Sequence, residues 1–134
     1  MILVTGGAFQ GKREFARTLK PNATEADVKL LEQGSLIVES MEHNSPQDTV
    51  LIADFHLYIK KLLQNEKDVQ QEVKQLLCKY PEVIITVTEL GCGIVPAEAF
   101  DRKYRETVGR ICCEIAKEAE AVYRVNCGVG MKIK

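Results

Sequence analysis

The chain has 134 residues, enough for one domain with its own core, and its composition of 46% hydrophobic and 28% charged residues is ordinary for a soluble protein. Its net charge of -1 provides no positive field for a nucleic acid. No apolar stretch reaches membrane-spanning length, and the N-terminus lacks the pattern of a signal peptide. We therefore expect a cytoplasmic protein without nucleic-acid or membrane partners. The five cysteines contain no C-x-x-C pair, which argues against a zinc site.

The N-terminal part begins with a buried strand over residues 2–5, which two glycines end, and continues with a helix over residues 12–19. Thr24-Glu25-Ala26-Asp27 resembles a capping box, so it predicts a second helix that begins there and ends near Gly34. Two less regular segments are predicted next, a short strand over residues 36–38 and a loop over residues 44–48.

From residue 49 onward, short apolar runs alternate with helical patterns. A helical stretch over residues 57–79 contains the wholly polar residues 65–68, which are a candidate break. Alternating strands and helices imply crossover connections, so they predict an α/β fold with a mostly parallel sheet flanked by helices and a C-terminal hairpin. The other predicted elements are strands over residues 49–53, 83–87, 121–125 and 131–133 and a helix over residues 98–120.

The segment Gly6-Gly7-Ala8-Phe9-Gln10-Gly11-Lys12 matches the G-x-x-x-x-G-K pattern of a phosphate-binding loop. In that motif backbone N–H groups face phosphate oxygens, the next helix presents its N-terminus, and the lysine reaches the outer phosphates. A glycine-rich turn without a ligand is the alternative, but the position between a strand and a helix favours phosphate binding. Arg13 stands where the motif has a hydroxyl ligand of Mg²⁺, and it could contact phosphate or point away. The predicted nucleotide-binding residues are Gly6, Gly7, Ala8, Phe9, Gln10, Gly11, Lys12 and Arg13.

Two carboxylates follow predicted strands, and parallel strands end at one edge of a sheet, where ligands bind. Asp54 ends the buried run over residues 50–53, where a carboxylate usually holds Mg²⁺, although it could instead cap the next helix. Glu89 follows the strand over residues 83–87 in a loop rich in glycine and is a candidate metal or substrate ligand. His56 lies close to Asp54, but a lone histidine at a helix start is more often structural.

Four segments carry motifs that are longer than the glycine loop. Residues 1–12 match M-I-L-V-T-G-G-A-x-x-G-K, and residues 87–96 match T-x-E-x-G-x-G-I-V-P with a valine in first place. Residues 104–110 echo a helical F-R-D-x-x-G-R motif, and residues 128–132 echo G-x-x-x-K. In these motifs the chain resembles the adenosylcobinamide kinase / adenosylcobinamide-phosphate guanylyltransferase family of cobalamin biosynthesis.

The resemblance implies a P-loop NTPase-like fold in a single nucleotide-binding domain over residues 1–134. It also implies ATP or GTP as substrate, adenosylcobinamide as phosphate acceptor, and a homo-oligomer, specifically a trimer. Because position 13 lacks the hydroxyl ligand, we expect Mg²⁺ to be held more weakly than in ordinary P-loop kinases. Lys12 would hold phosphate and Asp54 or Glu89 a metal ion, so these three residues are the catalytic candidates. Arg105 and Arg110 could add positive charge, although ordinary solvated helix charge is the slightly better explanation.

The chain also departs from the family that it resembles. Arg13 replaces the serine of the loop, and Thr88 replaces an asparagine. The segment over residues 21–48 is shorter than in the family, and its single histidine, His43, lacks the motif that surrounds the guanylyl-accepting histidine. Two hypotheses follow. The protein is a kinase that has lost its guanylyltransferase half, or it is a nucleotide-binding protein without turnover, with a regulatory or subunit role.

Overall fold

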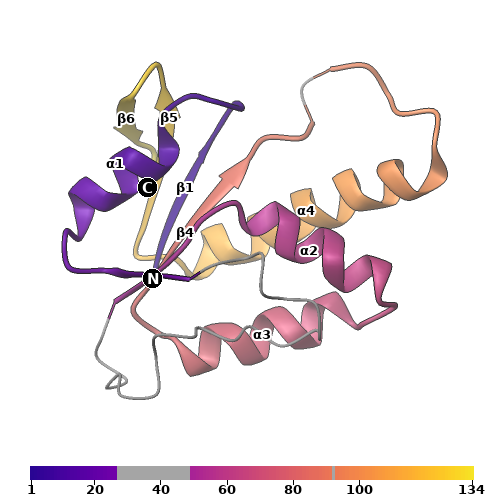
Figure 1. The fold of residues 1–134 in the computed structure, drawn as a ribbon, viewed down its shortest axis with the longest axis horizontal. Helices are drawn as coiled ribbons and strands as arrows, with labels where there is room; N and C mark the ends of the chain where they lie inside the picture. The colour runs from indigo at the N-terminus through magenta and orange to yellow at the C-terminus, as the bar shows by residue number, and fades with distance from the viewer. Residues whose placement is uncertain (27–48, 92) are drawn as a thin grey trace.

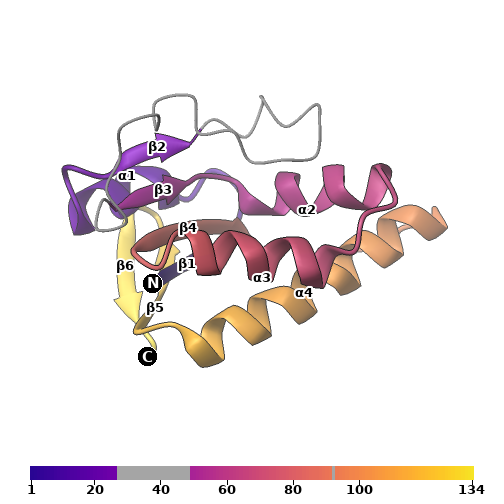
Figure 2. The ribbon, with the colours of Figure 1, turned by 90° about the horizontal axis from the view of Figure 1, so that it is seen from below.

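The computed structural model describes residues 1–26, 49–91 and 93–134. These residues form a six-stranded sheet with the strand order β2-β3-β4-β1-β5-β6 (Figures 1 and 2). Within the described sheet five strands are parallel, and β6 runs antiparallel to β5 as a C-terminal hairpin. The predicted α/β class and mostly parallel sheet are confirmed. The strands are β1 (Ile2–Gly6), β2 (Thr24–Ala26), β3 (Val50–Ile52), β4 (Val83–Thr88), β5 (Ala121–Asn126) and β6 (Val129–Lys132).

The sheet is covered on both faces, and its residues alternate between them. Leu3 and Ile85 point into a large apolar cluster with three of the helices, whereas Val4 and Ile84 point into a smaller cluster with the remaining one. This alternation is the period of two of a strand buried on both faces. Figures 1 and 2 show α1 apart from the other three helices. The helices are α1 (Lys12–Leu19), α2 (Phe55–Gln64), α3 (Val69–Lys79) and α4 (Ala99–Glu118).

The polar residues 65–68 divide the long helical stretch, as predicted. Glu66 has φ 54, which ends α2, and the side chain of Asp68 accepts a hydrogen bond from the N–H of Gln71 at 3.1 Å, which caps α3. None of the helices in the described ranges combines the length and the apolarity that a membrane crossing requires.

The capping-box prediction at Thr24 is wrong. Residues 24–26 form the edge strand β2, in which Thr24 donates a backbone hydrogen bond to the carbonyl oxygen of Thr49 at 3.0 Å and Ala26 is 3% exposed. Pairing with the buried β3 outweighs a short local motif, because it satisfies backbone groups and buries a side chain at once. The rest of that predicted helix, the strand over residues 36–38, the loop over residues 44–48, His43 and Cys92 lie outside the described residues.

Candidate functional site

The glycine loop lies where the carboxyl end of β1 meets the N-terminus of α1. Gly6 has φ +150, and a Cβ atom there would sit 2.3 Å from the carbonyl oxygen of Val125 in β5. Gly11 has φ +81 and precedes α1, where its carbonyl oxygen accepts a 3.0 Å hydrogen bond from the N–H of Phe15. Glycine is therefore required at both ends of the loop, by a neighbouring strand at one and by left-handed backbone at the other.

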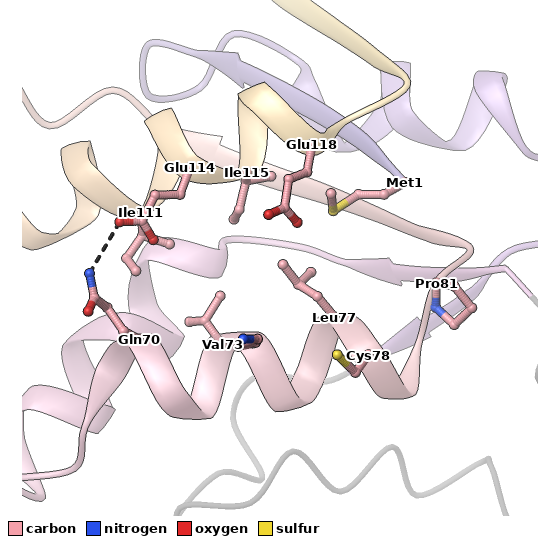
Figure 3. A pocket seen from close by; sticks show the side chains of 11 residues that line it. Met1, Gln70, Val73, Leu77, Cys78, Pro81, Ile111, Glu114, Ile115 and Glu118 are labelled. Carbon is pink, nitrogen blue, oxygen red and sulfur yellow. Dashed lines mark hydrogen bonds between the residues drawn. The ribbon is translucent and has the colours of Figure 1, made fainter.

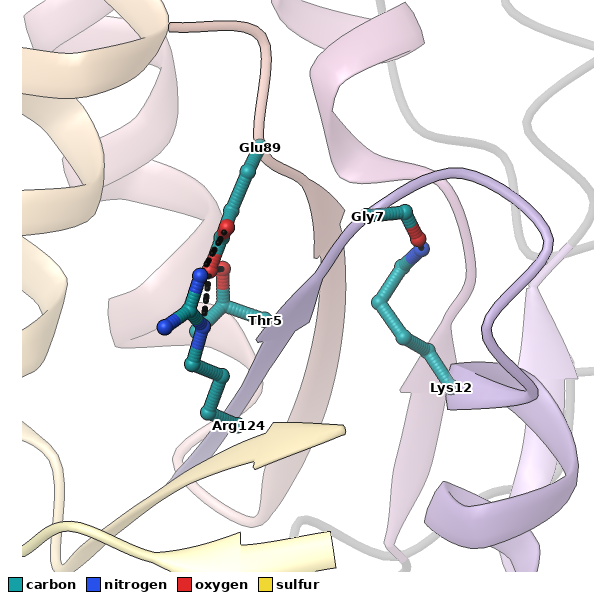
Figure 4. A network of polar contacts seen from close by, with 5 residues as sticks. All are labelled: Thr5, Gly7, Lys12, Glu89 and Arg124. Carbon is teal, nitrogen blue, oxygen red and sulfur yellow. Dashed lines mark hydrogen bonds and ion pairs between the residues drawn. The ribbon is translucent and has the colours of Figure 1, made fainter. Parts of the chain in front are cut away.

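Lys12 is the first residue of α1, and its side chain bends back over the loop. Its Nζ donates a 2.6 Å hydrogen bond to the carbonyl oxygen of Gly7 (Figure 4), and the residue is only 6% exposed. Burial lowers the pKa of the Lys12 amine, while the negative charges of Asp54 and Glu89 oppose that shift. The amine is thus held against the loop backbone, the part of this motif that binds phosphate groups.

A cavity of about 370 Å³ opens beside the loop and is lined by residues 8–13 and by Asp54. Asp54 stands between β3 and α2 with φ 53, a left-handed conformation that is uncommon outside glycine. Its N–H donates a 3.0 Å hydrogen bond to Oγ1 of Thr86, and its side chain makes no capping hydrogen bond to α2. Asp54 therefore lines the loop cavity with Lys12, and its carboxylate does not cap the helix.

His56 lies in the first turn of α2 and lines the same cavity. Its Nδ1 accepts a 3.4 Å hydrogen bond from the N–H of Thr88 at the end of β4. Burial lowers the pKa of His56, the charge of Asp54 raises it, and the charge of Lys12 lowers it further. A neutral imidazole suits this contact, because a protonated Nδ1 could not accept the hydrogen bond. The histidine that the sequence marked as structural thus also contributes to the wall of the site.

Glu89 lies apart from Asp54, against an arginine that the sequence analysis missed. Nε of Arg124 donates to Oε1 of Glu89 at 3.0 Å, and its second guanidinium nitrogen lies 2.9 Å from Oε2 (Figure 4). The Thr5 hydroxyl adds a 3.4 Å contact to Oε1. This carboxylate lines a second cavity, of about 300 Å³, which also contains Arg105. The signal for Arg124 in the sequence is a charged residue within an otherwise apolar strand, which the register places opposite Thr5.

Arg13 points toward the edge strand β2, where its guanidinium pairs with Oε1 of Glu25. Arg17, one turn further along α1, pairs with Oε2 of the same carboxylate at 2.6 Å. Arg13 still lines the loop cavity, whereas Arg17 is not among its lining residues. Of the two alternatives for Arg13, the structure therefore shows pairing with a carboxylate at the border of the site.

Gln10 joins the glycine loop to the C-terminal hairpin. Its Oε1 accepts a 2.6 Å hydrogen bond from the N–H of Cys127, and its carbonyl oxygen accepts one of 2.9 Å from the N–H of Gly128. Both donors belong to the turn between β5 and β6, more than a hundred residues away in sequence. The hairpin thereby fixes the conformation of the loop on one side.

Arg105 and Arg110 of α4 have different surroundings. The Arg105 guanidinium donates to the carbonyl oxygens of Ile94 at 2.7 Å and Gly91 at 2.8 Å, so it holds the loop that follows Glu89. Arg110 pairs at 2.5 Å with Glu106, one turn away on the exposed face of α4. The solvated-charge explanation applies to Arg110, and Arg105 is a loop-holding residue.

A third cavity, of about 510 Å³, is larger than the one beside the loop but lies between α3 and α4 next to Met1 (Figure 3). Its walls are mostly apolar, for example Val73 and Ile111, and a 3.2 Å hydrogen bond from Gln70 to Glu114 crosses its rim. Of its lining residues, Met1 belongs to one of the sequence motifs, and none belongs to the glycine loop. We take the loop cavity as the candidate site because the chemistry-bearing residues converge there.

A family model described as cobinamide kinase / cobinamide phosphate guanyltransferase matches residues 22–133. The chain belongs to this family. The match begins after the glycine loop, so the loop geometry and the family match are independent observations. The matched residues include Asp54, His56 and Glu89.

Two curated relatives agree with this family. The bifunctional adenosylcobalamin biosynthesis protein CobU of Escherichia coli strain K12 is 27% identical over 180 aligned positions, which span 100% of this chain and 99% of that protein. The protein of the same description from Salmonella typhimurium strain LT2 is 26% identical over 182 positions, with the same coverage. Both alignments are longer than the 134 residues of this chain, which is therefore shorter than these relatives.

Proposed function

We propose that the protein is a nucleotide-dependent phosphotransferase that uses ATP or GTP to phosphorylate a hydroxyl group of adenosylcobinamide. Family membership supports a role in cobinamide metabolism and in nucleotide binding. The observation that carries the proposal is Lys12, whose buried amine lies on the glycine loop beside a cavity of about 370 Å³. We propose residues 1–134 as one nucleotide-binding domain.

In this proposal the protein acts mainly by holding the phosphates and balancing their charge, which is the main demand of phosphoryl transfer. The loop over residues 6–12 binds the phosphate oxygens through its backbone, and Lys12 adds the charge. Asp54 raises the pKa of Lys12 against the effect of burial, so it helps to keep that amine protonated. Glu89, paired with Arg124, would form the wall on the acceptor side.

The side chains near the loop do not make the usual P-loop magnesium site. Position 13 carries a cation in place of a hydroxyl ligand, and both oxygens of Glu89 are bound by Arg124. Within the described ranges, no group of three or more His, Cys, Asp or Glu side chains could hold a metal ion. Asp54 is the remaining predicted ligand, and we expect a single carboxylate to hold Mg²⁺ weakly.

We also propose that the guanylyltransferase half is lost. The two relatives are described as bifunctional, and this chain is shorter than both. His43 has no family motif around it, and Nδ1 of His56 is engaged by the N–H of Thr88. Assembly as a trimer stays a prediction of the resemblance, which sedimentation velocity would test.

A nucleotide-binding protein without turnover is the second candidate. Its support is Arg13, which takes the place of a catalytic-site hydroxyl and pairs with Glu25. A cobinamide phosphorylation assay with ATP and with GTP separates the two candidates, because both predict nucleotide binding and only the first predicts product.

The test of the shared claim is the variant Lys12→Ala. Loss of one charge-assisted contact to phosphate should lower the affinity for ATP or GTP about tenfold or more, which is about 1.4 kcal/mol, as measured by isothermal titration calorimetry. Lys20→Ala is the matched control, because Lys20 is an exposed lysine at the other end of α1. Equal affinities for Lys12→Ala and the wild-type protein would refute the phosphate site.

A further inference from the structure

Arg13 follows the loop lysine, Lys12, directly in the sequence. In a P-loop this residue is a serine or threonine whose hydroxyl ligates Mg²⁺, and the ion neutralises the phosphates of the nucleotide. Arg13 replaces that hydroxyl with a positive charge, which repels a divalent cation and attracts a phosphate group. The side chains present thus disagree with the metal that the motif implies, and they supply a cation of their own at the same position.

The resting contact of Arg13 allows its release. Arg13 and Arg17 share the single carboxylate of Glu25, so the cluster carries one positive charge in excess. If Arg13 turned toward the cavity, Arg17 would remain paired with Glu25, and no buried carboxylate would be left without a cation. The Arg13 side chain is 51% exposed and that of Glu25 is 22% exposed, so this ion pair is only partly buried. Its exchange costs little as long as Arg17 stays paired with the carboxylate.

The position of Arg13 gives it access to a bound nucleotide. It lines the loop cavity together with Lys12 and Asp54, and it lies in the first turn of α1, directly beyond the loop. A planar guanidinium can donate two parallel hydrogen bonds to phosphate oxygens, which an ammonium group cannot. Arg17 does not line the loop cavity, so it lacks this access to a bound nucleotide.

We propose that Arg13 exchanges Glu25 for the phosphates of the bound nucleotide and supplies charge that Mg²⁺ supplies in an ordinary P-loop. Nucleotide binding by this protein is then largely independent of Mg²⁺. This inference rests on the proposed nucleotide site. It adds that Arg13 allows the site to bind the nucleotide without the metal ion.

The experiment is calorimetric titration of the full chain with ATP and with GTP, in EDTA and in excess Mg²⁺. The wild-type protein should bind with affinities that differ by less than about threefold between the two conditions. Arg13→Ser should bind about tenfold or more weakly in EDTA, and Mg²⁺ should restore much of the loss through the new hydroxyl. Arg110→Ser, which removes an exposed arginine of α4 that does not line the loop cavity, should behave as the wild-type protein does.

A second variant keeps the inference testable if Arg13→Ser does not fold. Glu25→Gln releases Arg13 without shortening it, so it should tighten binding in EDTA. Wild-type binding that needs Mg²⁺, or an Arg13→Ser variant with unchanged affinity in EDTA, would overturn the role of Arg13 while the nucleotide site stands. A wild-type protein that binds no nucleotide in either condition would instead refute the proposed function itself.

Discussion

At the scale of single residues, the ring of His56 ties the N-terminus of α2 to the end of β4 through the Thr88 N–H. Burial is the main cause that lowers the pKa of His56 below its ordinary 6.5. On acidification the unfolded chain therefore takes up this proton at a higher pH than the folded protein does. Neutral His56 therefore contributes its full stabilisation of the folded protein above pH 6.5. This stabilisation is lost as the pH falls from 6.5 through the lower pKa that His56 has in the folded protein.

We predict that His56→Gln weakens this pH dependence. Between about pH 7.5 and about pH 5.5, the free energy of unfolding of the wild-type protein should fall more steeply than that of the variant, as urea denaturation would measure. Aspartate and glutamate side chains with ordinary pKa values titrate mostly below this range and affect both proteins alike. If the free energies of unfolding of the two proteins changed in parallel with pH, the lowered pKa of His56 would not be the cause of this pH dependence.

Gln10 gives a second prediction at this scale. Gln10→Ala removes the acceptor of the Cys127 N–H and leaves the backbone contact with Gly128. We expect a loss of about 0.5–1.5 kcal/mol in the free energy of unfolding and weaker nucleotide binding, because the loop is less well held. The control is Phe9→Ala, since Phe9 is fully exposed at 104% and should change stability by less than about 0.5 kcal/mol. Equal losses in the free energy of unfolding for the two variants would show that the contact between Gln10 and the hairpin does not stabilise the loop.

At the scale of elements, the C-terminal hairpin packs on α1 through a glycine. A Cβ atom at Gly130 of β6 would lie 2.1 Å from the ring of Phe15. That ring also packs against Tyr123, with the ring centroids 5.3 Å apart and the planes tilted by 58°. Gly130→Ala must displace the ring, so we expect it to destabilise the protein by about 1–3 kcal/mol in thermal or urea denaturation. An unchanged transition midpoint would mean that Phe15 repacks without cost.

Gly109 is the matched glycine within α4. It is exposed, and a Cβ atom there would meet no atom within 4 Å. Gly109→Ala should therefore stabilise the protein by about 0.5–1 kcal/mol, because alanine loses less backbone entropy in a helix interior. The same denaturation experiment measures it. Destabilisation by both substitutions would show that the local space around each glycine does not decide the sign.

Elements with strong local signals could be predicted from the sequence. The bounds of α1 agree with the prediction, and the polar residues 65–68 correctly divide the second helical stretch. The error came at Thr24, where a four-residue capping motif competed with pairing to β3. Strand pairing depends on a partner more than twenty residues away, so no local pattern reveals it.

At the scale of the whole molecule, the sheet explains which parts of the site the sequence could predict. The carboxyl ends of β1 and β3 bring Lys12 and Asp54 to one cavity, as the rule for parallel sheets indicates. Glu89 follows β4 at the same edge but lines a different cavity, beside α4. The edge of the sheet at which a site residue lies follows from the topology, whereas the side of the sheet that it faces depends on the last residues of its strand. The pairing of Glu89 with Arg124 depends on the register between β1 and β5, which the sequence does not reveal.

We predict that this chain, which is shorter than its bifunctional relatives, forms no covalent guanylyl-histidine with either of its two histidines. A nucleophilic imidazole needs an unprotonated nitrogen that faces the α-phosphate. In neutral His56, Nδ1 accepts the Thr88 N–H, so the proton resides on Nε2 and that nitrogen is a donor. His43 lies outside the described residues and lacks the family motif in its sequence.

The test is incubation with GTP labelled at the α-phosphate, followed by denaturing electrophoresis at alkaline pH, where a phosphoramidate survives. A family member that retains the histidine motif serves as the positive control. We expect no labelled band for this protein. An acid-labile band that disappears in His56→Ala or His43→Ala would restore the transferase reaction and identify its nucleophile. It would leave the proposed phosphate site at Lys12 unaffected, because that proposal depends on the loop between β1 and α1 and not on either histidine.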